Sequence, residues 1–140
     1  MAISNRLSEC VRQVTPVDER ILHIRLEHTC GFMTVVAVYA PPEDHSLRDK
    51  EQFYHKLDSV VGRCPTGDVL VVLGDFNAET GSDRAEYESC LGPHGFGDRK
   101  DNSQFLLEFA ELIGLWIGGS WFQGSISPRL CWYSITGWVK

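Results

Sequence analysis

Five consecutive apolar residues at positions 69–73 (VLVVL) lead directly into Gly74 and Asp75, with Asn77 two positions further on. A short β-branched run bounded by turn-forming residues is typical of a buried strand. Because an amphipathic helical pattern precedes the run, we expect a central strand that is covered on both faces of its sheet. Residues 70–78 (LVVLGDFNA) are therefore predicted to place Asp75 and Asn77 where this strand meets its loop.

Two further strands are predicted upstream, joined as a hairpin. Residues 20–28 (RILHIRLEH) alternate with a period of two and have one apolar face. Residues 33–39 (MTVVAVY) are more continuously apolar and β-branched, so we expect this strand to lie deeper. The turn is expected at residues 28–31, where Gly31 can adopt a positive φ. The two strands should form an antiparallel pair.

Two amphipathic helices are predicted, one over residues 47–61 and one from residue 102 or 103 to residue 113. Most charged residues of the first helix, Lys50 among them, should lie off its apolar face. Ser46 is the expected N-cap of the first helix, and Gly114 is expected at the C′ position of the second. The buried residues are expected to be Phe53, Leu57, Val60 and Val61 in the first helix and Phe105, Leu106, Phe109, Leu112 and Ile113 in the second.

Strands and helices that mix in this order predict an α/β fold, and the hairpin makes a mixed sheet more favourable than a purely parallel one. Residues 115–117 and 131–134 are the remaining predicted strands. Neither an internal repeat nor an interdomain linker interrupts the 140 residues, so a single domain is expected.

Composition narrows the class of protein. The sequence is 43% hydrophobic and 23% charged, as in soluble globular proteins, and its apolar runs are too short to span a membrane. Its five scattered cysteines form no CxxC pair, which favours reduced, buried thiols in an intracellular protein, nuclear or cytoplasmic. The net charge of -6 argues against a polyanion-binding surface. It does not argue against a divalent cation, which needs carboxylates and then supplies positive charge.

Asp75 and Asn77 form the pattern that bears most directly on chemistry. A carboxylate and a carboxamide two residues apart, where a strand meets its loop, can face a single ligand. In phosphodiester hydrolysis a carboxylate can orient or deprotonate water, or hold Mg²⁺, and an amide can donate to a phosphate oxygen. Gly74 permits the close approach of backbone or substrate. The alternative is structural, because Asp and Asn after a strand commonly cap turns.

Longer strings extend this pattern to a known family. VYAPP at 38–42 and VLGDFNAETG at 72–81, with one amphipathic helix between them, resemble the endonuclease/exonuclease/phosphatase superfamily, which includes deoxyribonuclease I and the apurinic endonucleases. Nearly the whole chain is similar to the endonuclease domain of RTE/BovB-type non-LTR retrotransposons and to vertebrate host copies of it. The resemblance implies part of a four-layer α/β/β/α sandwich of deoxyribonuclease I type, with mixed, largely antiparallel sheets.

The resemblance also implies an activity, the nicking of duplex DNA with Mg²⁺ or Mn²⁺ and without another small-molecule cofactor. It assigns Asp75 to positioning or activating the nucleophilic water, and Asn77 to contacting the scissile phosphate. Tyr39 matches a position near that phosphate, although a tyrosine packed at the sheet edge is the alternative. Protein partners are not indicated.

Other matches are weaker. His94 in GPHGFG and Asn102 before the second helix match family positions that could contact substrate. A loop surface position explains His94 equally, and N-capping explains Asn102. Glu79 and Asp83 follow the GDFN motif closely, but solvated loop carboxylates are the simpler interpretation. The aromatic pair at 132–133 matches a family strand, and core packing alone would also account for it.

The family site has further groups that this sequence does not match: an asparagine on an early strand, a metal-binding glutamate on the next, and a C-terminal Asp-His pair. The principal metal ligand is therefore absent, and Asp75 is the remaining candidate ligand. We expect an incomplete domain that lacks its N-terminal strands and its C-terminal Asp-His motif. Such a chain should be marginally stable and catalytically dead or nearly so.

Three functional hypotheses follow. The first is a metal-dependent, DNA-nicking endonuclease of retrotransposon origin, inactive as these 140 residues. The second is a non-catalytic, domesticated remnant that acts as an interaction module. The third is a phosphoesterase of the same fold, with the same aspartate and asparagine chemistry but different substrate loops.

Overall fold

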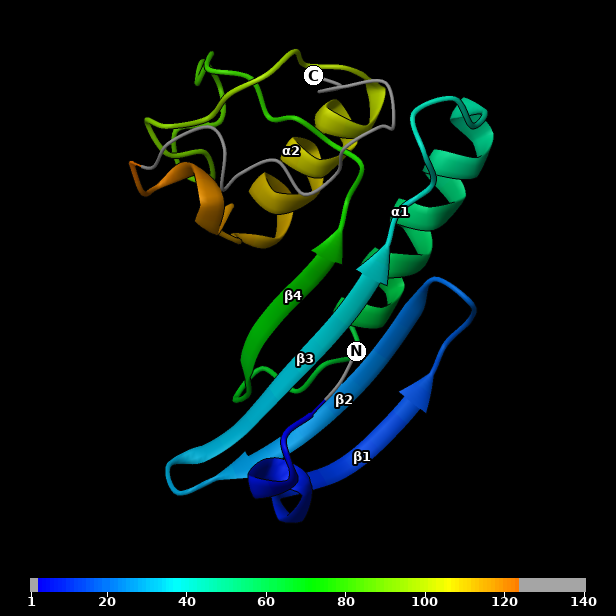
Figure 1. Cartoon of the computed structure of the whole chain (residues 1–140), viewed down its shortest axis with the longest axis vertical. Coiled ribbons are helices and arrows are strands. Elements are labelled where there is room, and N and C mark those ends of the chain that lie inside the picture. The colour runs from blue at the N-terminus through cyan, green and yellow to red at the C-terminus, as the bar shows by residue number, and fades with distance from the viewer. Residues whose placement is uncertain (1–2, 124–140) are drawn as a thin grey trace. The chain divides into compact units, whose positions relative to one another are not determined.

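A four-stranded mixed sheet forms the framework of the N-terminal part of the chain (Figure 1). The structure is a computed structural model that describes residues 3–123. The chain divides into two compact units, Met1–Asn77 and Ala78–Lys140, and each is described by itself. The mixed α/β architecture predicted from the sequence is confirmed.

The sheet of the first unit consists of β1 (Val11–Pro16), β2 (Ile21–His28), β3 (Gly31–Tyr39) and β4 (Val69–Asp75), in that order. β1 and β2 are antiparallel, β2 and β3 are antiparallel, and β3 and β4 are parallel. The predicted hairpin and the predicted mixed sheet are therefore confirmed. β1 was not predicted, because a bulge between Val11 and Gln13 breaks the two-residue alternation that would have revealed it.

The hairpin turn between β2 and β3 is short and depends on one glycine. Thr29 and Cys30 connect the strands, and the backbone N–H of Cys30 donates to Nδ1 of His28 at 3.2 Å. Gly31 has a φ of +138°, which a residue with a side chain rarely adopts. The role predicted for Gly31 is confirmed.

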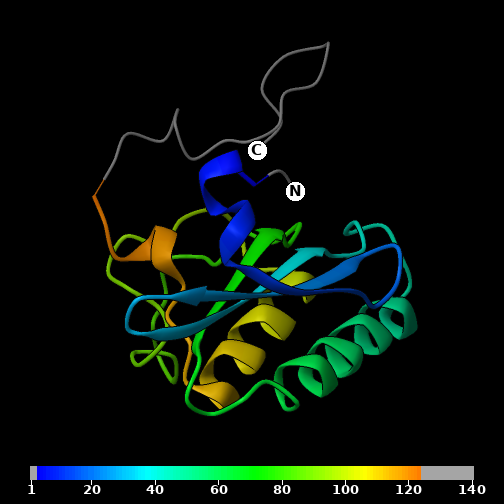
Figure 2. The same cartoon turned by 90° about the horizontal axis from the view of Figure 1, so that it is seen from below.

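The register of the strands sorts their side chains onto two faces, because cross-strand partners point to the same side. Thr34, Val36 and Val38 are buried on the face covered by α1 (Leu47–Val61), whereas η1 (Asn5–Cys10) lies on the other side of the sheet (Figure 2). That other side, which we call the apolar face, carries Val11, Val14, Pro16, Leu22, Ile24, Leu26, Met33, Val35, Ala37, Val69, Val71 and Leu73.

The helix α1 begins and packs largely as predicted. The hydroxyl of Ser46 accepts from the backbone N–H of Asp49 at 3.2 Å, which confirms Ser46 as the N-cap. The four residues predicted to be buried in this helix are buried. The position expected for Lys50 was wrong: it is buried, because Glu43 before the helix offers its amine a backbone and a carboxylate oxygen at 2.7 and 3.0 Å.

The strand β4 lies at the edge of the sheet that the described residues form. Val69 and Leu73 are 52% and 42% exposed, so the prediction of a central strand covered on both faces was wrong for this part of the chain. The run is continuously apolar for another reason. Leu70 and Val72 share the α1 face with Thr34 and Val36, while Val69, Val71 and Leu73 belong to the apolar face.

A buried ion pair fixes the start of β4 to the middle of the sheet. Arg25 of β2 donates from Nε and Nη2 to the two carboxylate oxygens of Asp68, at 2.7 and 2.9 Å. The hydroxyl of Thr34 on β3 donates to the same carboxylate at 2.9 Å. The Asp68 side chain is only 3% exposed. Its pKa lies below the usual value because the bonds from Arg25 outweigh the opposing effect of burial, with help from Thr34.

The second unit is built around α2 (Asp101–Ile113) and a loop core of Tyr87, Cys90 and Leu91. Gly114 ends the helix with a φ of +68°, as predicted. The predicted apolar stripe was partly wrong: Leu106 and Phe109 are buried, but Phe105 and Ile113 are only partly buried and Leu112 is 77% exposed. Leu107 and Ala110 are buried instead, since the loop core lies over their side of the helix.

Residues 115–117 form no strand, contrary to prediction. Leu115 and Ile117 pack against the core of the second unit, and the backbone N–H of Ile117 donates to the carbonyl of Cys90 at 2.9 Å. A 3-10 turn, η2 (Gly118–Ser120), follows. The strand predicted at 131–134, with its aromatic pair, lies outside the described residues.

Within residues 3–123, no helix combines the length and apolarity needed to cross a membrane. Cys10, Cys30, Cys64 and Cys90 are free thiols, as predicted. Only Cys90 among them is buried, so the expectation that the thiols are buried holds for one of the four.

Candidate functional site

The carboxyl ends of β3 and β4 bring Tyr39 and Asp75 side by side. The two strands run parallel (Figure 1), and their register makes Tyr39 and Asp75 direct partners. Partners in adjacent strands lie about 4.8 Å apart and point to the same side of the sheet. The register therefore joins two of the predicted site residues, which stand far apart in the sequence, at the end of the apolar face.

Gly74 makes this close pairing possible. Its φ is +146°, and a Cβ atom built on it would lie 1.9 Å from the carbonyl oxygen of Val38. No residue with a side chain can take this position without moving β3 away from β4. The close backbone approach predicted for Gly74 is confirmed, with β3 as the neighbour.

Asp75 and Asn77 form a tight turn that ends the strand. One carboxylate oxygen of Asp75 accepts from the backbone N–H of Asn77 at 2.9 Å, and the Asn77 side chain donates to the carbonyl of Ala40 at 2.8 Å. Asn77 has a φ of +48°, which asparagine tolerates better than most residues. The structural alternative weighed for these residues is therefore real, since both side chains shape the turn.

The turn leaves Asp75 accessible. Asp75 is an exposed residue, and the backbone carbonyl of Asp75 accepts from Ala40 at 2.8 Å, which extends the pairing of the two strands past Tyr39. Asp75 thus has a fixed backbone and an exposed side chain. A group held in this way can orient water or a ligand without rearrangement.

Tyr39 is half exposed, at 49%, and lies against an arginine that sequence reasoning missed. The guanidinium carbon of Arg20 is 5.5 Å from the centroid of the Tyr39 ring, and its Nη1 donates to the Tyr39 carbonyl at 3.4 Å. Arg20 gave no signal in the sequence, because only the antiparallel pairing of β2 and β3 brings it to this edge.

The described residues do not form a complete metal site. No group of three His, Cys, Asp or Glu side chains in residues 3–123 is arranged to hold a metal ion. His23 and His28 of the hairpin therefore belong to no such group. Asp75 supplies one carboxylate at the carboxyl end of β4. Mg²⁺ is commonly bound by one or two carboxylates together with substrate phosphates and water, so Asp75 fits part of such a site but not the whole.

The weaker candidates lie in the second unit. His94 sits in a loop, where its backbone N–H donates to the carbonyl of Ser120 at 2.8 Å. Asn102 is fully buried in the first turn of α2. The N-cap role weighed for Asn102 was wrong, because the helix begins at Asp101 and the N-cap is Lys100, whose N–H donates to Ser103 Oγ at 3.1 Å.

The two carboxylates after the GDFN motif have structural partners. Glu79 accepts from the backbone N–H of Asp98 at 2.9 Å, and Asp83 accepts from that of Ala85 at 3.0 Å. Both side chains therefore shape loops of the second unit.

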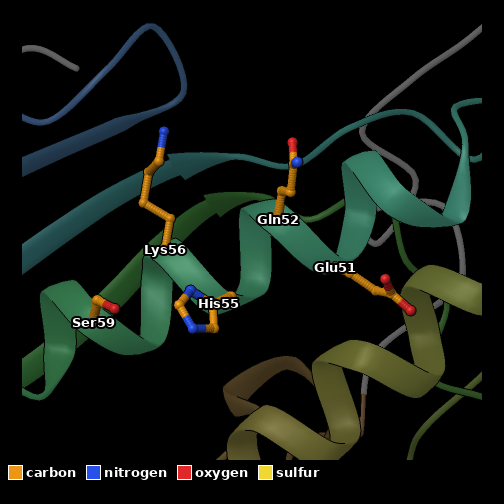
Figure 3. A pocket seen from close by; sticks show the side chains of 5 residues that line it. All are labelled: Glu51, Gln52, His55, Lys56 and Ser59. Carbon is orange, nitrogen blue, oxygen red and sulfur yellow. The ribbon is translucent and has the colours of Figure 1, made fainter.

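A shallow hollow on α1 is unrelated to the predicted site residues. It is lined by Glu51, Gln52, His55, Lys56 and Ser59, all from this one helix (Figure 3). The side chains project in different directions and do not converge on one point (Figure 3). Lys56 is already engaged, because its amine donates to Asp18 at 2.6 Å. The hollow has no arrangement that would select a ligand.

Comparison with known proteins gives homology without an activity. No protein-family model matches the chain. The chain is homologous to craniofacial development protein 2, with 26% identity to the protein from Bos taurus and 25% to that from Tragulus javanicus, each over 98% of this chain. It spans only 23% and 24% of the length of these relatives. The comparisons therefore establish homology to these two proteins, while membership of the nuclease superfamily and an origin in a retrotransposon stay predictions.

Proposed function

We propose that the carboxyl ends of β3 and β4 form part of a metal-dependent phosphodiesterase site that acts on duplex DNA. This part binds the phosphate and orients the attacking water. The observation that carries this proposal is the register pairing of Tyr39 with Asp75, next to the turn that holds Asn77. The family resemblance assigns these three residues to one site. Their placement at one edge is what such a site requires.

The residues have separate roles in this proposal. The Asp75 carboxylate orients the attacking water and accepts its proton as the new oxygen–phosphorus bond forms. The bond between phosphorus and the leaving sugar oxygen breaks in the same step, and that oxygen takes up a proton from solvent. The Asn77 side chain, held by Ala40, donates to a phosphate oxygen without adding negative charge. The Tyr39 hydroxyl stands beside the same phosphate. Mg²⁺ or Mn²⁺, when bound, would neutralise charge on the phosphate.

The resemblance assigns further catalytic groups that do not match these 140 residues. Catalytic groups that act as a unit are strongly non-additive, so one missing member removes most of the rate. We therefore propose that the 140-residue chain alone cleaves DNA poorly or not at all. Cleaving activity is therefore to be sought in a version of the chain extended at both ends to supply those groups, which we call the complete protein.

The apolar face supports a finer proposal about the fold. We infer that a second β-sheet covers this face, as in the four-layer sandwich of the deoxyribonuclease I type. Leu73 and Val69 are substantially exposed, while Ile24 and Val35 near the middle are buried, so the face is apolar from edge to edge but incompletely covered. Two sheets that pack face to face bury such surfaces.

A labelling experiment tests the second sheet. In a Cys30→Ser background, Leu73→Cys should react rapidly with a thiol reagent in the 140-residue chain and slowly in the complete protein. Leu112→Cys, also highly exposed, serves as the matched position in the second unit. Equal reactivity of Leu73→Cys in both proteins would show that no second layer covers the face.

Plasmid nicking tests the activity. The complete protein should convert supercoiled to open-circular DNA with Mg²⁺ and not with a chelator present. Asp75→Asn should slow this roughly 100- to 1000-fold, the loss typical of one preorganised catalytic group. Asp58→Asn, which removes an exposed carboxylate from α1, should leave the rate unchanged. Failure of the complete protein to nick DNA, or nicking that survives Asp75→Asn, would reject the proposal.

A non-catalytic interaction module is the second candidate, and the apolar face favours it specifically. Under this hypothesis the face supports association and Asp75 only shapes its turn. The complete protein would then lack nicking activity, while Leu73→Cys would still be protected from labelling. The two experiments together separate the candidates.

A further inference from the structure

Arg20 extends the row of residues at the candidate site by one strand. It directly precedes β2, and the backbone N–H of Tyr39 donates to its carbonyl at 2.9 Å. This bond continues the antiparallel ladder of β2 and β3 beyond the Ile21 and Val38 pair. Arg20, Tyr39 and Asp75 therefore lie side by side across three neighbouring segments of the sheet, at one end of the apolar face.

The guanidinium of Arg20 is directed toward this row. It lies 5.5 Å from the centroid of the Tyr39 ring and bonds the Tyr39 carbonyl through Nη1. A guanidinium has five N–H donors in a planar fork, and this contact uses one of them. The ring and the carbonyl orient the fork and leave donors for a further acceptor.

The turn before β2 holds the Arg20 backbone firmly. One carboxylate oxygen of Asp18 accepts from the backbone N–H groups of Arg20 and Ile21, at 2.8 and 2.9 Å. The other oxygen of Asp18 accepts from the Lys56 amine at 2.6 Å. The Asp18 charge is thus matched by Lys56, and the charge of Arg20 is not needed to balance it.

Arg20 differs in this respect from the other arginines of the sheet. Arg12 is paired with Glu27, and Arg25 is paired with Asp68. Among the residues that the structure describes, Arg20 forms no ion pair with a carboxylate; its contacts are the ring and carbonyl of Tyr39. An uncompensated guanidinium over an aromatic ring is well suited to a phosphate, which it can bind in a bidentate manner.

We propose that Arg20 is a substrate-binding residue whose guanidinium holds a DNA phosphate oxygen at the site formed by Asp75 and Asn77. The inference rests on the proposed function and adds to the three residues of that site a positively charged side chain. Two strand spacings, about 10 Å, separate the backbones of Arg20 and Asp75, and a phosphate can lie between their side chains. Arg20 offsets the repulsion that Asp75 exerts on the phosphate in an acidic protein.

Salt dependence of binding is the sharpest test, because each phosphate contact releases counterions. Binding of a fluorescent duplex to the complete protein would be measured over a range of salt concentrations with a chelator present to prevent cleavage. Arg20→Gln should weaken binding about tenfold at low salt and reduce the slope of log K against log salt by about 0.9. Arg20→Lys should retain the slope.

Arg12→Gln is the matched control, since it removes the same charge from the same sheet. It should change neither affinity nor slope, because Arg12 is neutralised by Glu27. Unfolding midpoints of all variants would be compared, so that a folding defect is not read as a binding defect. An Arg20→Gln slope equal to that of Arg12→Gln would reject the assignment of Arg20.

The binding assay and the cleavage assay test separate claims. A protein that nicks DNA, but whose slope does not depend on Arg20, would refute this inference and keep the proposed function. A protein with the Arg20-dependent slope but no nicking would refute the proposed function and keep Arg20 as a phosphate contact. A protein that does not bind the duplex would reject both.

Discussion

Two aspartates mark the two ends of β4, and their surroundings are opposite. Asp68, before the strand, has a buried side chain that accepts from Arg25 and Thr34. Asp75, at the end of the strand, is exposed and bonded by a backbone N–H. The same residue type therefore fixes the strand in the sheet at one end and presents a carboxylate at the other. The difference distinguishes a residue that fixes the position of β4 from a residue whose side chain is accessible to a ligand.

The largest effect on stability is expected at Gly74, which directly precedes Asp75 in β4. Gly74→Ala should lower the free energy of unfolding by at least about 3 kcal/mol, because its Cβ would collide with the Val38 carbonyl at a strained positive φ. Chemical denaturation would measure this. Gly67→Ala, at which a Cβ meets nothing, is the control. An equal effect at both glycines would contradict the close pairing of β3 and β4.

Asp68→Asn should lower the unfolding midpoint more than any substitution of Asp75, because it leaves the guanidinium of Arg25 without its charged partner. Thermal unfolding followed by circular dichroism would measure it. Asp44→Asn, whose side chain is 89% exposed, should leave the midpoint unchanged. If Asp68→Asn melts like the Asp44 variant, the buried pair does not fix β4.

Asn77 lies between these extremes, because it both shapes the turn and belongs to the proposed site. Asn77→Ala should cost about 1–2 kcal/mol, from the lost bond to Ala40 and the left-handed backbone. Asn77→Gly keeps the backbone conformation and should recover part of this. Urea denaturation of both variants would show it, and the idea fails if Gly is the worse replacement.

The smallest expected effect is on the stability of the fold at low pH. The pKa of Asp68 is lowered in the folded protein, mainly by Arg25, so its ionised form stabilises the fold. This stabilisation is complete above the ordinary value of 3.8 and is lost as the pH falls below it through the folded pKa. Stability measured from pH 5 downward should therefore fall less steeply in Asp68→Asn than in the unmodified protein. Parallel curves would contradict this sign.

Local sequence patterns predicted most elements and the hairpin pairing of β2 and β3, but not the position of β4 in the sheet. The hairpin, α1 and the Ser46 cap follow from periodicity and capping, which act over a few residues. The position of β4 at an edge depends on which strands pair, and an apolar run looks the same when only one face is covered by a helix. β1 was missed because its bulge disrupts the pattern.

The candidate site shows the same division. Asp75 and Asn77 could be identified because they are close together in one motif, and the family resemblance added Tyr39. Arg20 could not be identified, since its approach to Tyr39 depends on the register of two strands. Lys50 was misplaced for a related reason, because its buried amine is explained only by acceptors on Glu43.

The most direct test is the plasmid-nicking rate of Asp75→Asn in the complete protein, compared with that of Asp68→Asn at equal folded fraction. We predict that Asp75→Asn melts like the unmodified protein and loses nicking roughly 100- to 1000-fold, whereas Asp68→Asn melts earlier and nicks normally once folded. Nicking that survives Asp75→Asn, or is lost equally in both variants, would contradict the assignment of Asp75 as the acting carboxylate.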